Sequence, residues 1–404
     1  MRPIPVAGML FEQGNAPLVA VNQVGPRTSA FQARHLKSQL AAVQWDFKNS
    51  TSRSAIEGLH PYPAKFIGEI PRALLEILPV PSGTVVLDPF CGSGTTLVEC
   101  QRKGLPSVGI DLNPIACLMA RVKTQPIADD LDSSISAVVL GAKSTSQPRI
   151  PQIPNLDHWF KPEVQHALAA LTGAIAVAPE THREILRLAI SSIVVRVSNQ
   201  ESDTRYAAIN KDVTADQVFS SFSKAARRVG DVLGSRDYEL SPAQVCEGDT
   251  LAFPATAVRH PVGIVITSPP YPNAYEYWLY HKYRMWWLGF DPLFVKDREI
   301  GARAHFFKGD RHTAEDFVQQ MGKTFALLKQ VVIMGGFVCF VVGRSRIHGE
   351  LVDNAKIIDR VGVEAGFSPF YAKERILSPN RKSFNLSHAN IKTETILVLR
   401  RNKS

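Results

Sequence analysis

The first candidate functional group is a glycine turn that lies between two acidic residues. The run Asp88–Thr96 reads DPFCGSGTT and follows a β-branched segment, and Asp111 ends the next such segment. Glycines at 92 and 94 permit a tight turn, and the N–H groups of a following helix attract a carboxylate or phosphate. An acid at the end of the next strand can hold ribose hydroxyls. The pattern predicts a site for a ribose-bearing cofactor, with a ligand-free turn as the alternative.

Two other nucleotide-binding patterns do not match this turn. The dinucleotide fingerprint G-x-G-x-x-G requires glycine at position 97, where this chain has Leu97. A phosphate-binding P-loop requires Gly-Lys-Ser/Thr, and no such triplet follows the turn. The sequence therefore disfavours a nicotinamide dinucleotide and a nucleoside triphosphate.

The second chemical group is Thr267-Ser268-Pro269-Pro270-Tyr271, at the end of another apolar segment. Two prolines remove two backbone donors, which leaves the serine hydroxyl and nearby carbonyls as acceptors. A planar ring that carries an NH₂ group could donate to these acceptors and stack on the tyrosine. The alternative is an ordinary proline turn at the end of a strand.

Together these groups resemble the amino-methyltransferases of DNA, which use S-adenosylmethionine to methylate exocyclic base amines. The family's D-P-F-x-G-S-G-T-T motif is matched by Asp88–Thr96, and its (D/N/S)-P-P-(Y/F) motif by Ser268–Tyr271. The segment His60–Phe66 resembles the one that surrounds the methionine end of the cofactor. The resemblance covers about 60–125 and 240–404, and the long segment between them departs from the family pattern.

The resemblance implies roles for individual residues. It implies a catalytic set of Ser268, Pro269, Pro270 and Tyr271. It implies cofactor binding by Lys65, Phe66, Asp88, Pro89, Phe90, Cys91, Gly92, Gly94, Thr95, Asp111, Leu112, Asn113 and Asp249, the last at the adenine edge. Substrate contacts are expected from Tyr275, Arg205, Arg344, Arg381 and Lys382. No metal ligand is expected.

The residue at position 268 bears on the target base. Serine there resembles the enzymes that methylate N4 of cytosine, whereas Asp or Asn is typical of adenine-specific relatives. N4 of cytosine in DNA is therefore the first hypothesis. The alternatives are N6 of adenine, then an RNA base amine, then an inactive nucleic-acid-binding protein. Attack on cytosine C5 needs a cysteine nucleophile, which usually follows a proline in such enzymes, and none of the five cysteines does.

Charge and composition agree with a polyanionic partner. The chain has 404 residues, a net charge of +9 and 45% hydrophobic residues. Eight basic and two acidic residues lie in the last 34 positions, so we expect this end to face DNA. The cysteines form no CxxC pair, and no signal or membrane-spanning pattern is visible, which predicts a cytoplasmic protein without a structural zinc site. The resemblance implies double-stranded DNA as a partner, and either a cognate restriction endonuclease or a solitary enzyme.

These motifs require a parallel sheet that brings strand ends together. We expect an α/β fold, a doubly wound and mostly parallel sheet of the class I methyltransferase type, with seven strands as the resemblance implies. The expected strands are 84–87, 107–110, 244–246, 263–267, 336–342 and 394–399, with helices near 30–43, 70–78 and 95–103.

Three regions follow from the pattern. Residues 1–59 form an N-terminal arm, and 60–124 with 240–404 form the catalytic domain. Residues 125–239 are predicted to be an insertion of about three helices, a candidate for target recognition. Capping-box patterns at Thr181 and Thr214 mark two helix starts, 141–154 is read as a linker, and Ser198–Tyr206 as a polar loop.

Overall fold

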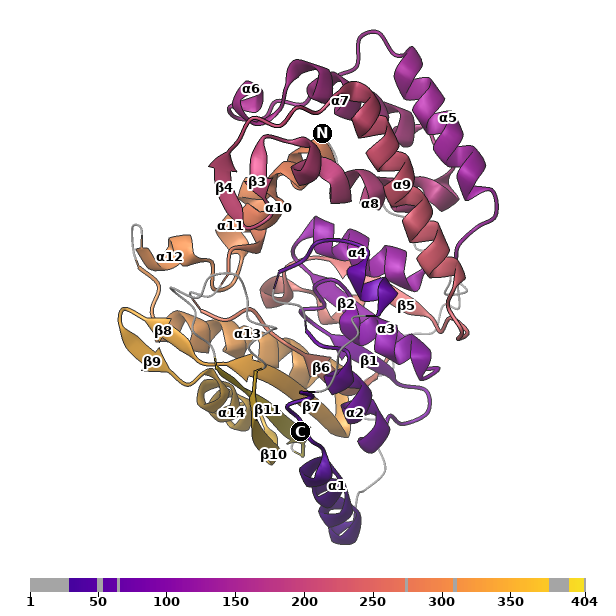
Figure 1. Cartoon of the computed structure of the whole chain (residues 1–404). Helices are drawn as coiled ribbons and strands as arrows, with labels where there is room; N and C mark the ends of the chain where they lie inside the picture. Colours follow the sequence, from indigo (N-terminus) through magenta and orange to yellow (C-terminus); the bar gives the residue numbers. More distant parts are fainter. Residues whose placement is uncertain are drawn as a thin grey trace.

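A seven-stranded sheet forms the centre of the molecule (Figure 1). The computed structural model describes residues 29–48, 54–63, 66–272, 275–307, 311–377 and 392–402. The strand order is β10-β11-β7-β6-β1-β2-β5, and only β11 runs antiparallel to its neighbours. The strands are β1 (Val85–Asp88), β2 (Ser107–Asp111), β5 (Ala243–Glu247), β6 (Val262–Thr267), β7 (Val332–Gly343), β10 (Phe367–Ile376) and β11 (Thr393–Arg401). The predicted mostly parallel α/β fold is confirmed.

The strand order reverses direction between β1 and β6. From β1 the chain builds outward through β2 and β5 on one side, and through β6 and β7 on the other. Such a reversal leaves a crevice at the carboxyl ends of the strands, where ligands bind in open α/β sheets. Asp88, Asp111 and Thr267 are the last residues of β1, β2 and β6, so all three lie at this edge.

Both faces of the sheet are covered, which explains why its central strands are apolar throughout. Val85 and Leu87 of β1 pack in a cluster with α13 (Ala314–Val331) and α14 (Asn354–Glu364). Val86, which points to the other face, packs in a cluster with α1 (Ala30–Ala42) and α2 (Glu69–Ile77). α3 (Thr95–Arg102) and α4 (Pro114–Thr124) follow β1 and β2.

The inserted region contains more structure than the sequence predicts. It holds α5 (Leu131–Ser144), α6 (Leu156–Trp159), α7 (Pro162–Ala176), α8 (Glu180–Val197), the hairpin strands β3 (Gln200–Ser202) and β4 (Arg205–Ala208), and α9 (Ala215–Gly234). The prediction of about three helices is therefore wrong. α5 extends to Ser144, so the linker predicted over 141–154 begins later. The polar loop predicted over Ser198–Tyr206 is mostly the β3–β4 hairpin, since its polar residues pair across two short strands.

One of the two capping boxes is confirmed. The Thr214 hydroxyl accepts the Gln217 N–H at 3.3 Å, and the Gln217 side chain accepts the Thr214 N–H at 2.9 Å. The start predicted at Thr181 is wrong, because α8 already begins at Glu180, after Pro179. Proline fixes φ at a value suited to a helix entrance, which moves the start toward it.

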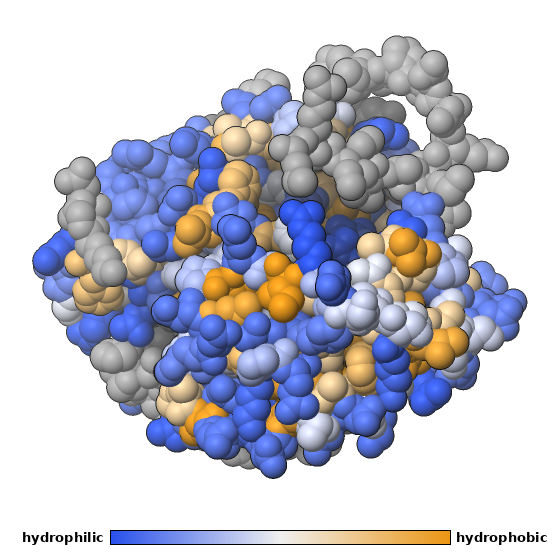
Figure 2. Space-filling model, turned by 90° about the horizontal axis from the view of Figure 1, so that it is seen from above, coloured by the Kyte–Doolittle hydropathy of each residue, from blue (hydrophilic) through white to orange (hydrophobic). Residues whose placement is uncertain are grey.

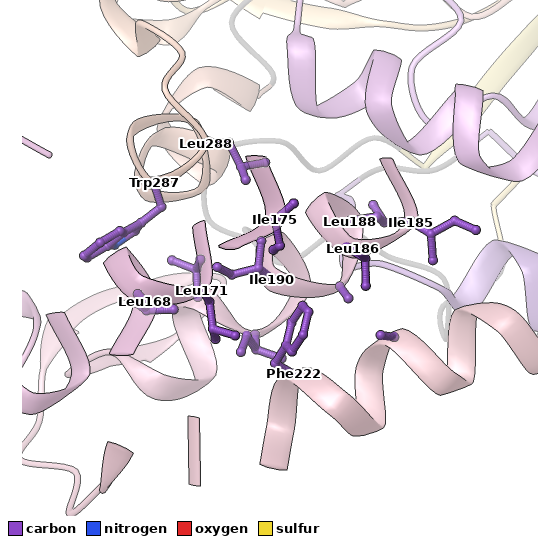
Figure 3. Packing of buried hydrophobic residues seen from close by; sticks show 14 of the residues in the cluster. Leu168, Leu171, Ile175, Ile185, Leu186, Leu188, Ile190, Phe222, Trp287 and Leu288 are labelled. Atoms are coloured by element: carbon purple, nitrogen blue, oxygen red, sulfur yellow. The ribbon is translucent and has the colours of Figure 1, made fainter. Parts of the chain in front are cut away.

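The insertion shares one hydrophobic core with the rest of the fold. Leu168, Leu186 and Phe222, from three inserted helices, are buried in the same cluster as Trp287 of α10 (Tyr277–Trp287) (Figure 3). The same cluster includes residues of α4. The insertion is therefore packed onto the sheet domain as a continuous extension. Seen from above, its outer surface is mostly hydrophilic, with hydrophobic residues in small groups (Figure 2).

The remaining elements are short. They are η1 (Ala55–Gly58), η2 (Thr250–Ala252), η3 (Ala255–Ala257), α11 (Pro292–Arg298), α12 (Arg303–Phe307), β8 (Ser345–Ile347) and β9 (Glu350–Val352). Within the described ranges, every helix is too short or too polar to cross a lipid bilayer.

The shared core predicts cooperative unfolding. Phe222→Ala should lower the free energy of unfolding by about 3–5 kcal/mol, because the side chain is fully buried between helices. Urea denaturation followed by circular dichroism measures this change. Val177→Ala is the matched control, since Val177 is 85% exposed and its truncation should cost less than about 0.5 kcal/mol. Two separate transitions, with only one shifted in Phe222→Ala, would show instead that the insertion folds independently.

Candidate active site

Residues of both motifs line one cavity at the carboxyl edge of the sheet. The lining residues are Tyr62, Phe90, Asp111, Leu112, Asn113, Asp249, Thr250, Ser268, Pro270, Tyr277, Val295, Arg298, Glu299 and Ile300. Seven of them belong to the predicted site: Phe90, Asp111, Leu112, Asn113, Asp249, Ser268 and Pro270. A second cavity, at the opposite edge near Thr84 and Pro106, is lined by no carboxylate. Groups with the predicted chemistry therefore meet in the first cavity.

The Asp111 carboxylate holds the glycine turn against the end of β2. One of its oxygens accepts the Gly92 N–H at 2.8 Å, and the other accepts the Asn113 N–H at 2.8 Å. Burial raises the pKa of Asp111 to about 6, although both hydrogen bonds lower it. Each carboxylate oxygen keeps a further lone pair, so ribose hydroxyls can still donate to this side chain.

The glycine turn leads directly into the N-terminus of α3. Gly94 has φ +83°, and a Cβ at this position would lie 2.8 Å from the Ala120 Cα, so only glycine suits both the backbone and the space. Because Gly94 has no capping side chain, the first N–H groups of α3 receive no hydrogen bond from a cap. They remain available to a carboxylate, such as that of a methionine moiety. The buried Lys123 supports the turn by donating to the Ser93 carbonyl at 2.7 Å.

Asp88 lies beneath the turn and joins it to the second motif. Its Oδ1 accepts the Phe90 N–H at 3.1 Å and the Thr267 hydroxyl at 2.6 Å. Thr267 directly precedes Ser268, so one buried carboxylate fixes the relative position of the two loops. Burial raises the pKa of Asp88 to about 6, against the lowering effect of these hydrogen bonds.

Two stacked tyrosines form part of the cavity wall. The rings of Tyr62 and Tyr277 lie 5.5 Å apart with an interplanar angle of 27°. A Cβ at Gly92 would lie 3.0 Å from the Tyr62 hydroxyl, so Tyr62 reaches over the glycine turn. Sequence reasoning did not assign Tyr62 a site role, although this aromatic residue in the His60–Phe66 segment was an available signal.

Tyr271 is directed toward the sheet. Its hydroxyl lies 3.4 Å from the Ser268 hydroxyl and donates to Glu394 of β11 at 3.2 Å. Glu394 also pairs with the buried Arg375 at 3.2 Å. Burial, followed by the nearby Glu394 charge, raises the pKa of Tyr271 well above its usual range. Tyr271 is not among the lining residues, and its stacking on a base stays a prediction.

Other predicted residues shape the site from outside the cavity wall. Pro89 accepts the Thr250 hydroxyl through its carbonyl, and Phe66 packs against the core cluster of α1 and α2. The Tyr275 ring lies 5.7 Å from that of Tyr277. Pro269, Cys91, Gly92, Gly94 and Thr95 likewise belong to the two loops without lining the cavity. Lys65, Arg381 and Lys382 lie outside the described residues.

Two of the predicted substrate contacts, Arg205 and Arg344, already have partners in the chain. Arg205 and Arg344 are exposed and pair with Glu201 and Glu374, both at a distance of 2.8–2.9 Å. In the basic C-terminal segment, Arg375 and Arg401 are buried within the sheet. These two arginines therefore cannot contribute to a basic surface. The charge available at this end to face DNA is smaller than the sequence predicts.

The cysteines are unsuited to nucleophilic attack. Burial raises the pKa of every one of the five, Cys91, Cys100, Cys117, Cys246 and Cys339. The Cys91 side chain fills the space over Gly109, where an added Cβ would lie 2.9 Å from its sulfur. A thiol with a raised pKa is rarely ionised at neutral pH, which argues against C5 methylation of cytosine.

Comparisons with known proteins bear on the sequence motifs. The N6_N4_Mtase family model, described as DNA methylase, matches residues 27–121. The chain is 28% identical to the type II methyltransferase M.MvaI of Kocuria varians, over 56% of this chain and 55% of that protein. It is 46% identical to the type II methyltransferase M.MjaII of Methanocaldococcus jannaschii, over 17% of this chain and 13% of that protein.

A solved structure gives a more distant match. The rRNA methyltransferase AviRa from Streptomyces viridochromogenes aligns at a TM-score of 0.34 and 13% identity, over 88% of this chain and 93% of that one. A third relative is the type II methyltransferase M.BsoBI of Geobacillus stearothermophilus, to which this chain is 21% identical over 58% of this chain and 53% of that protein. The chain thus spans about half the length of M.MvaI and of M.BsoBI.

The predicted resemblance to S-adenosylmethionine-dependent amino-DNA methyltransferases is confirmed by the family model and the type II relatives. The predicted cofactor, S-adenosylmethionine, is confirmed by the same family match. The family includes both N4 and N6 enzymes, so the match does not identify the target base.

The Asp111 geometry predicts a pH-dependent cofactor affinity. S-adenosylmethionine is cationic, so it should bind more tightly as pH rises through about 6 and Asp111 becomes charged. Asp111→Asn should weaken binding by about one to two powers of ten, the effect of a lost hydrogen bond to a charged group. It should also flatten the pH dependence. Calorimetric titration from pH 5 to 8 measures both effects, and unchanged affinity in the variant would exclude Asp111 from the cofactor site.

The Tyr271 hydroxyl is expected to stabilise the second loop. Tyr271→Phe should lower the free energy of unfolding by about 1–3 kcal/mol, because the partly buried Glu394 loses a donor. Tyr238→Phe is the control, since the buried Tyr238 hydroxyl has no hydrogen-bond partner among the described residues. Equal stabilities of the two variants, measured by urea denaturation, would show that this contact does not hold the loop.

Proposed function

We propose that this chain transfers a methyl group from S-adenosylmethionine to the exocyclic N4 amine of cytosine in DNA. The observation that carries the proposal is the shared cavity, since Ser268 and Pro270 line it together with Asp111 and Asp249. One cavity bounded by both motifs can hold a methyl donor beside an amine. This arrangement needs no covalent enzyme intermediate.

The residues present suit S-adenosylmethionine. The partly buried carboxylate of Asp111 and the acid Asp249 line the cavity and offer acceptors to ribose and adenine, while the N-terminus of α3 offers donors to a carboxylate. The carboxylates also compensate the positive charge of the bound sulfonium. When bound, the cofactor supplies an electrophilic methyl group. Phe90, Leu112 and the Tyr62–Tyr277 pair give apolar surface around it.

The second loop suits an amine with two hydrogens. Prolines at 269 and 270 have no N–H, so they offer no backbone donors that would compete with an amine. The proposed acceptors are the Ser268 hydroxyl, which lines the cavity, and the neighbouring Pro269 carbonyl. Hydrogen bonds from both amine hydrogens would favour a pyramidal nitrogen with an available lone pair. As this nitrogen bonds the methyl group, the methyl–sulfur bond of the cofactor would break, and one amine proton would then leave to a loop acceptor or to solvent. The base reaches such a loop only if it leaves the duplex stack. Positioning supplies most of the rate, for which effective molarities of roughly 10⁵–10⁸ M are attainable.

Serine at position 268 favours cytosine over adenine, because it matches the N4-specific form of the family motif. N6 of adenine is the second candidate, since the same loop chemistry serves any base amine. An RNA base amine and an inactive binding protein remain further alternatives. The intact acids and the loop Ser268–Tyr271, here named the SPPY loop, disfavour the inactive protein.

Double-stranded DNA is the proposed partner, and the insertion over 125–239 is the proposed target-recognition region. The β3–β4 hairpin supports this, since its strand β4 is exposed along its whole length and carries Arg205 and Tyr206. The Tyr206 hydroxyl donates to the Leu279 carbonyl of α10, so the hairpin lies close to the cavity wall.

We further propose that the protein acts in the cytoplasm, with a cognate restriction endonuclease or alone.

The product base tests this proposal. DNA incubated with the protein and S-adenosylmethionine, then digested to nucleosides, should contain N4-methylcytosine by mass spectrometry. Ser268→Ala should lower turnover about tenfold, equivalent to roughly 1.4 kcal/mol, because it removes one acceptor. Its cofactor affinity should remain near that of the wild-type protein.

The other products separate the alternatives. N6-methyladenine would contradict the cytosine assignment and retain the amine mechanism. 5-Methylcytosine would contradict the mechanism. Methylated RNA in the absence of methylated DNA would contradict the substrate class.

A further inference from the structure

Glu299 is a buried acid in the cavity wall that neither motif contains. It follows α11, lines the cavity and is only 6% exposed. Its two carboxylate oxygens accept the N–H groups of Tyr277 and Trp278, each at 2.7 Å. These are the first two N–H groups of α10, so one distant side chain caps the helix.

Among the residues that the structure describes, no other side chain caps this helix. Glu276, the residue before α10, makes no capping hydrogen bond and instead accepts the Ala304 N–H at 3.3 Å. The first N–H groups of a helix need acceptors, and a carboxylate there also interacts favourably with the helix dipole. Burial raises the pKa of Glu299 to about 8, with smaller contributions from Glu276 and Asp111. Burial disfavours the charged form of Glu299, and the hydrogen bonds from the N–H groups of Tyr277 and Trp278 offset part of that cost.

The cap at Glu299 reaches the cofactor side of the cavity through Tyr277. The Tyr277 ring stacks on Tyr62, and Tyr62 extends over the glycine turn at Gly92. A shift of the first turn of α10 would therefore move the aromatic wall above the turn.

The same short segment reaches the amine side through Gly301. Gly301 has φ +74°, and a Cβ there would lie 2.2 Å from the Tyr271 carbonyl oxygen. The backbone at 301 is thus in direct contact with the SPPY loop. Glu299 and Gly301 are two residues apart in the chain. Glu299 contacts the first turn of α10 on the cofactor side of the cavity, and Gly301 contacts the SPPY loop on the amine side.

We propose that Glu299 is a positioning residue that sets the spacing between the cofactor side of the cavity and the amine-binding loop. It acts through the N-terminus of α10 on one side and through the adjoining Gly301 on the other. The inference rests on the proposed function, because the spacing matters only if a methyl donor and an amine meet in this cavity. Displacements of about 1 Å can lower the rate of such a transfer by about 10²-fold.

The test compares Glu299→Gln with a matched cap variant, Asp291→Asn. Glu299→Gln keeps the size of the side chain and leaves one acceptor for two N–H groups. Its kcat for DNA methylation should fall between about tenfold and a hundredfold, with cofactor Kd and DNA KM changed less than about threefold. Asp291 caps α11 by accepting the Leu293 N–H at 2.8 Å and does not line the cavity. Asp291→Asn should retain kcat within about twofold.

Amide hydrogen exchange provides a readout that does not depend on methylation. In Glu299→Gln the amides of Tyr277 and Trp278 should exchange faster than in the wild-type protein, while those of α9 stay protected. If the wild-type protein methylates no DNA, the proposed function fails, whereas faster exchange at these amides still supports the cap. Wild-type kcat in a folded Glu299→Gln would overturn the positioning role. Equal losses in kcat, cofactor affinity and melting temperature would also overturn it, since they indicate general destabilisation.

Discussion

The hydrogen bond between the Thr267 hydroxyl and the Asp88 carboxylate connects the two halves of the site. It is 2.6 Å long, is buried, and joins the last residues of neighbouring parallel strands β6 and β1. Burying the carboxylate is costly, as the raised pKa of Asp88 indicates, and its hydrogen bonds offset part of that cost. Because Asp88 also accepts the Phe90 N–H, the glycine turn and the SPPY loop cannot move independently. The strand order places the two strands side by side, and this contact aligns their ends.

α10 connects the inserted region to this site. Its first turn carries Tyr277 in the cavity wall, and its buried Arg284 pairs with Asp203 of the hairpin segment and donates to the Ser191 carbonyl of α8 at 3.1 Å. Removing one partner of such a buried pair is strongly destabilising, because the other charge remains uncompensated. The insertion is thus held in a fixed position relative to the cavity, which its proposed role in target recognition requires.

The features that were predictable from sequence depend on local constraints. Gly94 needs a left-handed backbone, consecutive prolines remove donors, and the Thr214 box pairs residues three positions apart, so each leaves a pattern in a short window. Glu299 and Glu394 were missed because their partners lie 22 and 123 residues away, and only tertiary packing brings them together. β10 was also missed, since half of its strand is exposed and mixes charged with apolar residues. In the insertion, the short polar strands β3 and β4 and the serine-rich helix α5 carry too weak a periodic pattern to be separated from loops.

If one cavity holds both a methyl donor and a DNA base, labelled methyl groups must pass to DNA. The direct measurement is transfer of tritium from methyl-labelled S-adenosylmethionine to duplex DNA, with RNA of the same sequence as the comparison. We expect acid-precipitable tritium in the DNA sample and none in the RNA sample. The rate of label transfer should be much lower in Thr267→Val, which keeps the side-chain volume and removes the hydroxyl bound to Asp88. A protein that binds the cofactor but transfers no label to DNA, or a Thr267→Val variant with the full wild-type rate, would contradict this account.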